Sequence, residues 1–163
     1  MSINLPLTGT GIGIAQGLLE HVVAKLASGQ RRLAPLHSQP ADAPAHQMNI
    51  ADAARLIDTA RLHAFRAADE LDQVTAEGRR PDLEVRTRMR MDSSRAMRCA
   101  REAVGLLLDA AGAGSFADGA VLQRAWRDVE TSSRHASLSP EVVSREIYGR
   151  VLLGRKLPPS DLI

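Results

Sequence analysis

Aromatic residues and cysteine are scarce in this 163-residue chain. Aromatic residues make up 2% of the sequence and hydrophobic residues 44%, so a folded core must be built almost wholly from aliphatic side chains. A single cysteine, Cys99, excludes an internal disulfide and is typical of a reducing cytosol. The four aromatic residues leave little on which nucleic-acid bases could stack: Phe65, Phe116, Trp126 and Tyr148.

Long apolar runs and strand-like alternation are also missing. No stretch approaches the roughly 18 uninterrupted apolar residues that a membrane span requires. The start, Met1–Ile3, lacks the basic residues of a secretory signal. We therefore expect a soluble, cytoplasmic protein without a membrane partner, and the length fits a single domain over residues 1–163.

Lysine is nearly absent, so the positive charge comes from arginine. Lysine occurs only at Lys25 and Lys156; the net charge is +2 and the isoelectric point is about 9.2. Arginines are dense between Arg79 and Arg101, but on a helical wheel they do not form one stripe along which a phosphate backbone could bind. We therefore expect no nucleic-acid partner. The arginines fall on two sides of the wheel, with Arg86, Arg90 and Arg101 on one and Arg88, Arg95 and Arg98 on the other.

Apolar residues at helical spacing predict a first helix from near Thr10 to Gly29. The glycines at its start lack the preceding strand that a phosphate-binding loop needs, so they indicate close helix packing. Residues from about 30 to 47 contain three prolines and predict a Pro-rich crossover loop. A connection of this length allows the helices on either side to run parallel.

A second helix is predicted to begin at Asn49 as N-cap, with Asp52 as its capping partner, and to end at the break over residues 78–81. Half of its apolar seam is alanine, which allows a neighbouring helix to approach closely. The seam steps by three and four through Ile50, Ala53, Ile57, Ala60, Ala64, Ala67, Leu71 and Val74.

A third helix is predicted from about Asp82 to Ala111. Asp92 interrupts its inner face; such a carboxylate is at a helix end, paired with an arginine or functional, and we expect the pairing. The apolar members of that face are Val85, Met89, Ala96, Cys99, Ala103 and Leu106.

A fourth helix is predicted to start at Asp118 as N-cap, and a short fifth helix at Ser139 and Pro140. With no strand pattern, the expected fold is all-α: an up-and-down four-helix bundle with a short extra C-terminal helix.

The fourth helix carries an unusual polar face. On a wheel, Asp128, Thr131 and His135 lie within about 40° of Arg124. An arginine there could hold an anionic cofactor, and an imidazole could transfer protons near neutral pH. The alternative is an exposed Arg124–Asp128 ion pair at i,i+4 spacing with no function in binding, and periodicity leaves both open. The opposite side is apolar, with Leu122, Trp126 and Val129.

The remaining histidines are scattered without paired ligand spacing, so no metal site is expected. They are His21, His37, His46 and His63.

Together, these features resemble the C-terminal helical domain of acyl-CoA-dehydrogenase-like (group D) flavin-dependent monooxygenases, over almost the whole chain. The most specific elements are the Arg-Asp helix, the histidine seven residues after Asp128, and the closing Tyr-Gly-Arg. The segments that carry the resemblance are 11–17 (GIGIAQG), 109–112 (DAAG), 122–128 (LQRAWRD), 134–135 (RH) and 148–154 (YGRVLLG).

This resemblance implies an oxidoreductase that uses reduced flavin, FMN or FAD, delivered by a separate reductase, to hydroxylate an aromatic or other organic substrate with O2. It implies that His135 is catalytic, beside the flavin ring and substrate. Arg124 and Arg127 would lie near the flavin phosphate or a subunit interface, Asp128 would orient the arginine, and Thr131 would complete the cofactor contacts. The chain would form a homo-oligomer through the bundle.

Acyl-CoA dehydrogenases commonly place a catalytic glutamate after this helix, but residues 132–138 contain no carboxylate, which favours the monooxygenase branch. Whole members of the family also have an N-terminal helical domain and a β-domain, so we expect this chain to be either a fragment or a separately encoded C-terminal domain that another chain completes. The isolated chain is therefore expected to be inactive. The alternatives are a non-catalytic oligomerisation module and the C-terminal part of an acyl-CoA dehydrogenase.

Overall fold

The computed structural model describes residues 4–29, 39–135, 138 and 141–157. In this part of the chain the structure is helical and contains no strand, which confirms the all-α prediction. None of the helices in these ranges is both long and apolar enough to cross a membrane. The α-helices are α1 (Asn4–Ala27), α2 (Pro44–Ala76), α3 (Leu83–Ala111), α4 (Val121–Ser132) and α5 (Glu141–Leu152), with short 3-10 helices η1 (Pro40–Asp42) and η2 (Ala113–Phe116).

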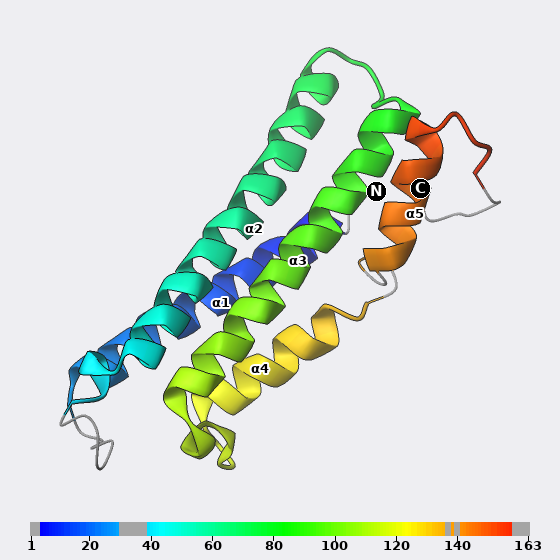
Figure 1. Cartoon of the computed structure of the whole chain (residues 1–163). Coiled ribbons are helices and arrows are strands. Elements are labelled where there is room, and N and C mark those ends of the chain that lie inside the picture. The colour runs from blue at the N-terminus through cyan, green and yellow to red at the C-terminus, as the bar shows by residue number, and fades with distance from the viewer. Residues whose placement is uncertain (1–3, 30–38, 136–137, 139–140, 158–163) are drawn as a thin grey trace.

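Figure 1 shows an up-and-down arrangement in which α1, α2 and α3 alternate in direction, and α4 and α5 follow one another along α3. Helix α3 is central and contacts each of the other four α-helices. Its burial extends well beyond the single inner face predicted from the sequence: Thr87, Ser93, Met97, Val104 and Leu108 are also buried. Because α3 contacts both α4 and α5, it determines where these two C-terminal helices lie.

The connection between α1 and α2 joins antiparallel helices, so the expectation that its length accommodates parallel neighbours is wrong. Gly29, at the end of α1, has φ +65, and a Cβ there would lie 2.5 Å from the Oε1 of Gln39, just before η1. The end of α1 and the entry to α2 therefore meet at the same end of the bundle. The last part of the predicted loop is helical, because η1 and the start of α2 lie within residues 40–47.

Two helices start earlier than the sequence predicts because proline is accepted in a first turn, where a backbone N–H has no helical acceptor. Helix α1 begins at Asn4 rather than Thr10 and includes Pro6. Helix α2 begins at Pro44, so Asn49 is inside the helix rather than at its N-cap. Asp52 pairs with Arg55 at 3.2 Å instead of completing a capping box.

The alanine-rich seam of α2 is confirmed, with five of its positions buried and three half-buried. The third helix also begins as predicted, since the Asp82 side chain caps it by accepting a hydrogen bond from the Val85 N–H at 2.9 Å. The prediction of close packing through the N-terminal glycines holds at Gly11, where a Cβ would lie 2.6 Å from the Met97 sulfur. It does not hold at Gly9, Gly13 or Gly17, whose added Cβ would meet nothing within 4 Å.

The fourth helix starts later than predicted. Ala120, not Asp118, is its N-cap, and no side chain caps it. The residues predicted to open the fifth helix, Ser139 and Pro140, lie outside the described residues, and α5 is described from Glu141.

Candidate functional site

The rotation of α4 about its axis is set by apolar contacts with the bundle. Leu122 and Val129 are buried, and Trp126 is half-buried with its ring edge-on to Phe116, at 5.7 Å between centroids and an interplanar angle of 77°. This apolar side is the one that the sequence pattern predicts. The polar side of α4 therefore faces outward.

Four of the five predicted site residues meet on that outward face. Arg124, Arg127, Asp128 and Thr131 are exposed and line a shallow hollow of about 440 Å³. Its remaining lining comes from Gln123 on α4 and from the turn before the helix at Gly119 and Ala120. The hollow thus combines two guanidinium groups, a carboxylate, a hydroxyl and an amide on about two turns of helix.

The two cations of this hollow have no carboxylate partner in the part of the chain that the structure describes. Among the described residues, no carboxylate oxygen lies within 4.0 Å of a guanidinium nitrogen of Arg124 or Arg127. The i,i+4 ion pair between Arg124 and Asp128, which was the alternative interpretation of this polar face, is therefore not formed. Two cations and one carboxylate leave the face with positive charge and free donors suited to an anion.

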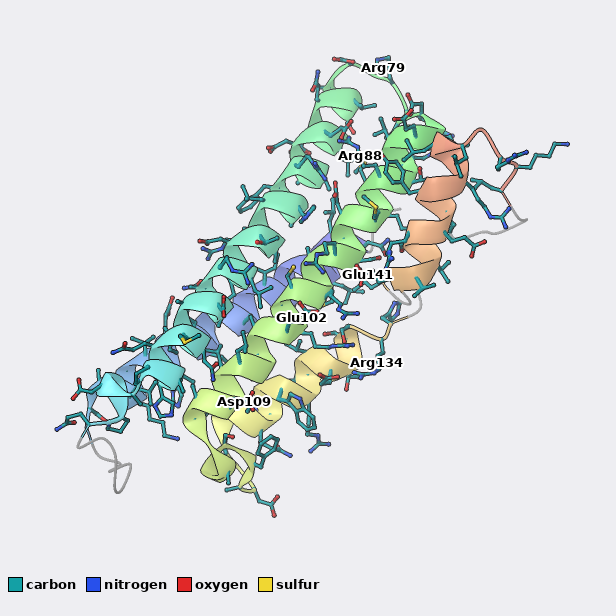
Figure 2. All side chains as sticks on the ribbon, in the orientation of Figure 1. Arg79, Arg88, Glu102, Asp109, Arg134 and Glu141 are labelled. Atoms are coloured by element: carbon teal, nitrogen blue, oxygen red, sulfur yellow. The ribbon has the colours of Figure 1, made fainter. Side chains whose placement is uncertain are left out.

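His135 does not share this hollow. Helix α4 ends at Ser132 with Ser133 as C-cap, so the helical wheel that placed His135 on the same stripe does not extend to it. His135 is exposed in the turn that follows; its N–H donates to the Ser132 carbonyl at 3.1 Å and its carbonyl accepts from the Leu138 N–H at 2.9 Å. Figure 2 labels the neighbouring Arg134 at the end of α4.

A second polar cluster joins α2 to α3. Asp92 is fully buried and accepts hydrogen bonds from Arg66, through Nε at 3.1 Å and through Nη2, and contacts the Nδ1 of His63 at 2.9 Å. The expected pairing of Asp92 with an arginine is confirmed. The hydrogen bond to Asp92 raises the pKa of Arg66 above its ordinary value, so this guanidinium stays charged.

The sequence interpretation missed His63 as a partner of Asp92, although a signal was present. Helices α2 and α3 form an antiparallel hairpin, so residues about equally far from the turn at 78–81 lie opposite each other. Arg66 and Asp92 obey this mirror relation, as do Glu70 and Arg88, which form a half-buried ion pair. Pairing by distance from the turn would have found these two ion pairs, and His63 lies one helical turn before Arg66 on the same face of α2.

No metal centre is present among the residues that the structure describes. No group of three or more His, Cys, Asp or Glu side chains there could hold an ion. Cys99 is buried in α3, and burial raises the pKa of its thiol, so it is not a reactive thiolate.

The structure is a close-packed antiparallel helical bundle with an open face on one short helix, where two guanidinium groups are exposed. The sequence profile of the acyl-CoA dehydrogenase C-terminal domain matches residues 7–140. The chain belongs to this family, which confirms the resemblance drawn from the sequence.

Its relatives in sequence are flavin-dependent monooxygenases. The oxygenase subunit HsaA of Mycobacterium tuberculosis (strain CDC 1551 / Oshkosh) is 30% identical over 98% of this chain. The oxygenase component of the FADH2-dependent resorcinol hydroxylase of Rhizobium sp. (strain MTP-10005) is 31% identical over 91% of it. The chain spans 39% and 37% of the lengths of these two proteins.

A solved structure shares the arrangement of the helices. XiaF from Streptomyces sp., in complex with FADH2 and glycerol, superposes with a TM-score of 0.88 at 31% identity. The match covers 96% of this chain and 39% of the XiaF chain.

Proposed function

We propose that this chain forms the helical, cofactor-contacting part of the oxygenase component of a cytoplasmic two-component flavin-dependent monooxygenase. The reaction is hydroxylation of an aromatic or other organic substrate with reduced flavin and O2. The observation that carries the proposal is the pair of guanidinium groups exposed together on α4, in a chain whose relatives are flavin-dependent monooxygenases.

The hollow on α4 has the chemistry required for a flavin phosphate. Arg124 and Arg127 supply charged donors, and Thr131 adds a hydroxyl donor. Asp128 lies in the same hollow without an ion pair to Arg124 or Arg127, and its proposed role is to orient one of these arginines when a phosphate is bound. Reduced flavin, when bound, supplies the electrons that activate O2, and the residues of this chain hold and orient it.

His135 is assigned to proton transfer. It is exposed just beyond the end of α4, where its ring is accessible to a group bound at the surface of the bundle. An imidazole can act as a general acid or base, so His135 would donate a proton to, or accept one from, a group bound beside it, such as a substrate hydroxyl.

Completion of the enzyme requires more than this chain. The relatives are more than twice its length, so we propose that an N-terminal helical domain and a β-domain, on the same or another polypeptide, complete the enzyme and that a separate reductase supplies reduced flavin. Homo-oligomerisation through the bundle is supported by α2, where Leu62 is 73% and Phe65 63% exposed.

That exposed apolar face also favours the second candidate, a helical oligomerisation module without chemistry. The C-terminal part of an acyl-CoA dehydrogenase is a weaker candidate, since residues 132–138 contain no carboxylate base. Flavin binding distinguishes the monooxygenase domain from the oligomerisation module, because a module that only oligomerises is not expected to bind flavin through α4.

Replacing both hollow arginines, Arg124→Gln with Arg127→Gln, is expected to weaken binding of reduced flavin to the completed oxygenase by about 10- to 100-fold. Each charge-assisted hydrogen bond contributes about 1.5–3 kcal/mol, less at an exposed site, and 1.4 kcal/mol is tenfold in affinity. Anaerobic fluorescence titration with FMN and FAD measures the change. Arg61→Gln, which removes an α2 arginine 4.0 Å from Asp58, is the matched control. Equal affinities in both variants would exclude a flavin site on α4.

The purified chain alone is expected to give no hydroxylated product with reduced flavin, O2 and an aromatic substrate. Its hollow is open to solvent on one side of a short helix, so nothing in the described part of the chain shields the flavin from water. Product analysis by mass spectrometry, with and without the completing polypeptide, provides the test. Hydroxylated product from the chain alone would refute the proposal that further domains are required for activity.

A further inference from the structure

Three polar residues on one face of α3 hold the ends of α4 and α5. Ser94, Arg98 and Arg101 follow one another at steps of four and three, so their side chains emerge from the same side of the helix. Each contacts a residue near the junction between α4 and α5. We refer to these three residues as the α3 stripe.

The stripe contacts α5 at two points. The Oγ atoms of Ser94 and Ser144 are 2.8 Å apart, and both serines are buried. Arg98 Nη1 lies 3.5 Å from the Oε2 of Glu141, which is the first residue of α5. The start of α5 is thus held by a buried hydrogen bond and an ion pair.

The third contact reaches α4. Arg101 Nε lies 3.8 Å from Glu130 Oε1, and Glu130 also forms an ion pair with Arg134, one residue before His135. Arg134 Nη1 donates to the Glu130 backbone carbonyl at 2.8 Å as well. Figure 2 shows Arg134 at the end of α4 and Glu141 at the start of α5, on the two sides of the junction.

Backbone hydrogen bonds and one buried side chain link the stripe to His135. Leu138 is 2% exposed, and its N–H donates to the His135 carbonyl. Leu138 lines a cavity of about 210 Å³ together with all three members of the stripe. The residue that fixes the carbonyl of His135 is therefore itself placed against α3.

From these contacts we infer that Ser94, Arg98 and Arg101 are positioning residues for His135. They hold the end of α4 and the start of α5, so that the imidazole of His135 keeps one position relative to the hollow on α4. This inference rests on the proposed function, which gives that placement its purpose. A shift of about 1 Å in a reacting group can cost about 100-fold in rate, so such a device has a direct effect on catalysis.

The ion pairs are partly exposed, with Arg98 48% and Arg101 32% accessible, so neither alone would dominate. We therefore choose the double variant Arg98→Gln with Arg101→Gln, and separately Ser94→Ala for the buried hydrogen bond. Arg88→Gln is the matched control, because it breaks an equally placed ion pair of α3 with Glu70 on α2 rather than with α4 or α5.

The primary measurement is 15N relaxation of the complete chain, without flavin. The His135 amide order parameter is expected to fall from about 0.85 to below about 0.6 in the double variant and in Ser94→Ala, and to stay unchanged in Arg88→Gln. The charge-conserving variant Arg98→Lys with Arg101→Lys should restore it in part. An unchanged order parameter in both stripe variants, or an equal fall in Arg88→Gln, would overturn the inference.

A second measurement tests the link to catalysis in the completed oxygenase. The double variant should lower the ratio of hydroxylated product to peroxide when His135 is present, but cause no further loss in a His135→Ala background. An equal loss in both backgrounds would overturn the positioning role. If His135→Ala alone has no effect while the order parameter still falls, the proposed role of His135 fails and the structural tether stands.

Discussion

Replacing Asp92 with alanine is expected to lower the free energy of unfolding by about 2–3 kcal/mol, or the Tm by about 5–10 °C. The carboxylate is fully buried and joins α3 to Arg66 and His63 of α2. Breaking a buried ion pair commonly costs about 3–5 kcal/mol, but Arg66 is 49% exposed and its charge can rehydrate, which lowers the expected cost.

Thermal and urea unfolding of the complete chain, followed by circular dichroism, measure the effect of this substitution. Asp58→Ala is the control, because Asp58 is an α2 carboxylate of the same size and charge that is 74% exposed and lies 4.0 Å from Arg61 on the same helix. It should change the stability by less than about 0.5 kcal/mol. If Asp92→Ala and Asp58→Ala unfolded at the same temperature and urea concentration, the buried cluster would contribute nothing to the stability of the bundle.

Replacing His135 with alanine is expected to lower the hydroxylation rate of the completed oxygenase by about 100-fold or more, the usual contribution of a positioned acid or base. Reduced flavin should still be oxidised, with its electrons released as hydrogen peroxide instead of appearing in product. Because His135 is exposed beyond α4, the substitution should leave the fold intact. Product and peroxide are quantified together under limiting reduced flavin.

The matched control is His21→Ala, which removes an exposed imidazole of α1. It should leave both hydroxylation and peroxide release at the wild-type level. Hydroxylation and peroxide release that remain unchanged in His135→Ala would remove this residue from the mechanism, and the α4 hollow would then be a binding face only.

Helix interiors were predictable from the sequence, whereas the starts of α1, α2 and α4 were not. The seam of α2 and the cap at Asp82 follow directly from spacing and from a carboxylate at the right distance from the Val85 N–H. Asn49 and Asp118 have equally good capping side chains, yet the helices begin at Pro44 and Val121. A capping residue only permits a helix start; packing of the preceding turn determines whether it is used.

The candidate site was predictable where it lies within one helix. Arg124, Arg127, Asp128 and Thr131 share a face because the period of α4 is maintained through all of them. His135 departs from that face because α4 ends at Ser132, and nothing in the local residues marks that end clearly. A helical wheel is reliable only up to the last residue of the helix.

Taken alone, the sequence determined the all-α class, the outward polar face of α4 and the family, because periodicity and short motifs are local properties of the chain. Only the tertiary structure decided which distant residues meet: Asp92 with His63 and Arg66 across the α2–α3 hairpin, and Arg101 with Glu130 at the α4 end. Those contacts depend on how far each helix extends and how α3 is surrounded, which are set by packing of the whole bundle rather than by any segment within it.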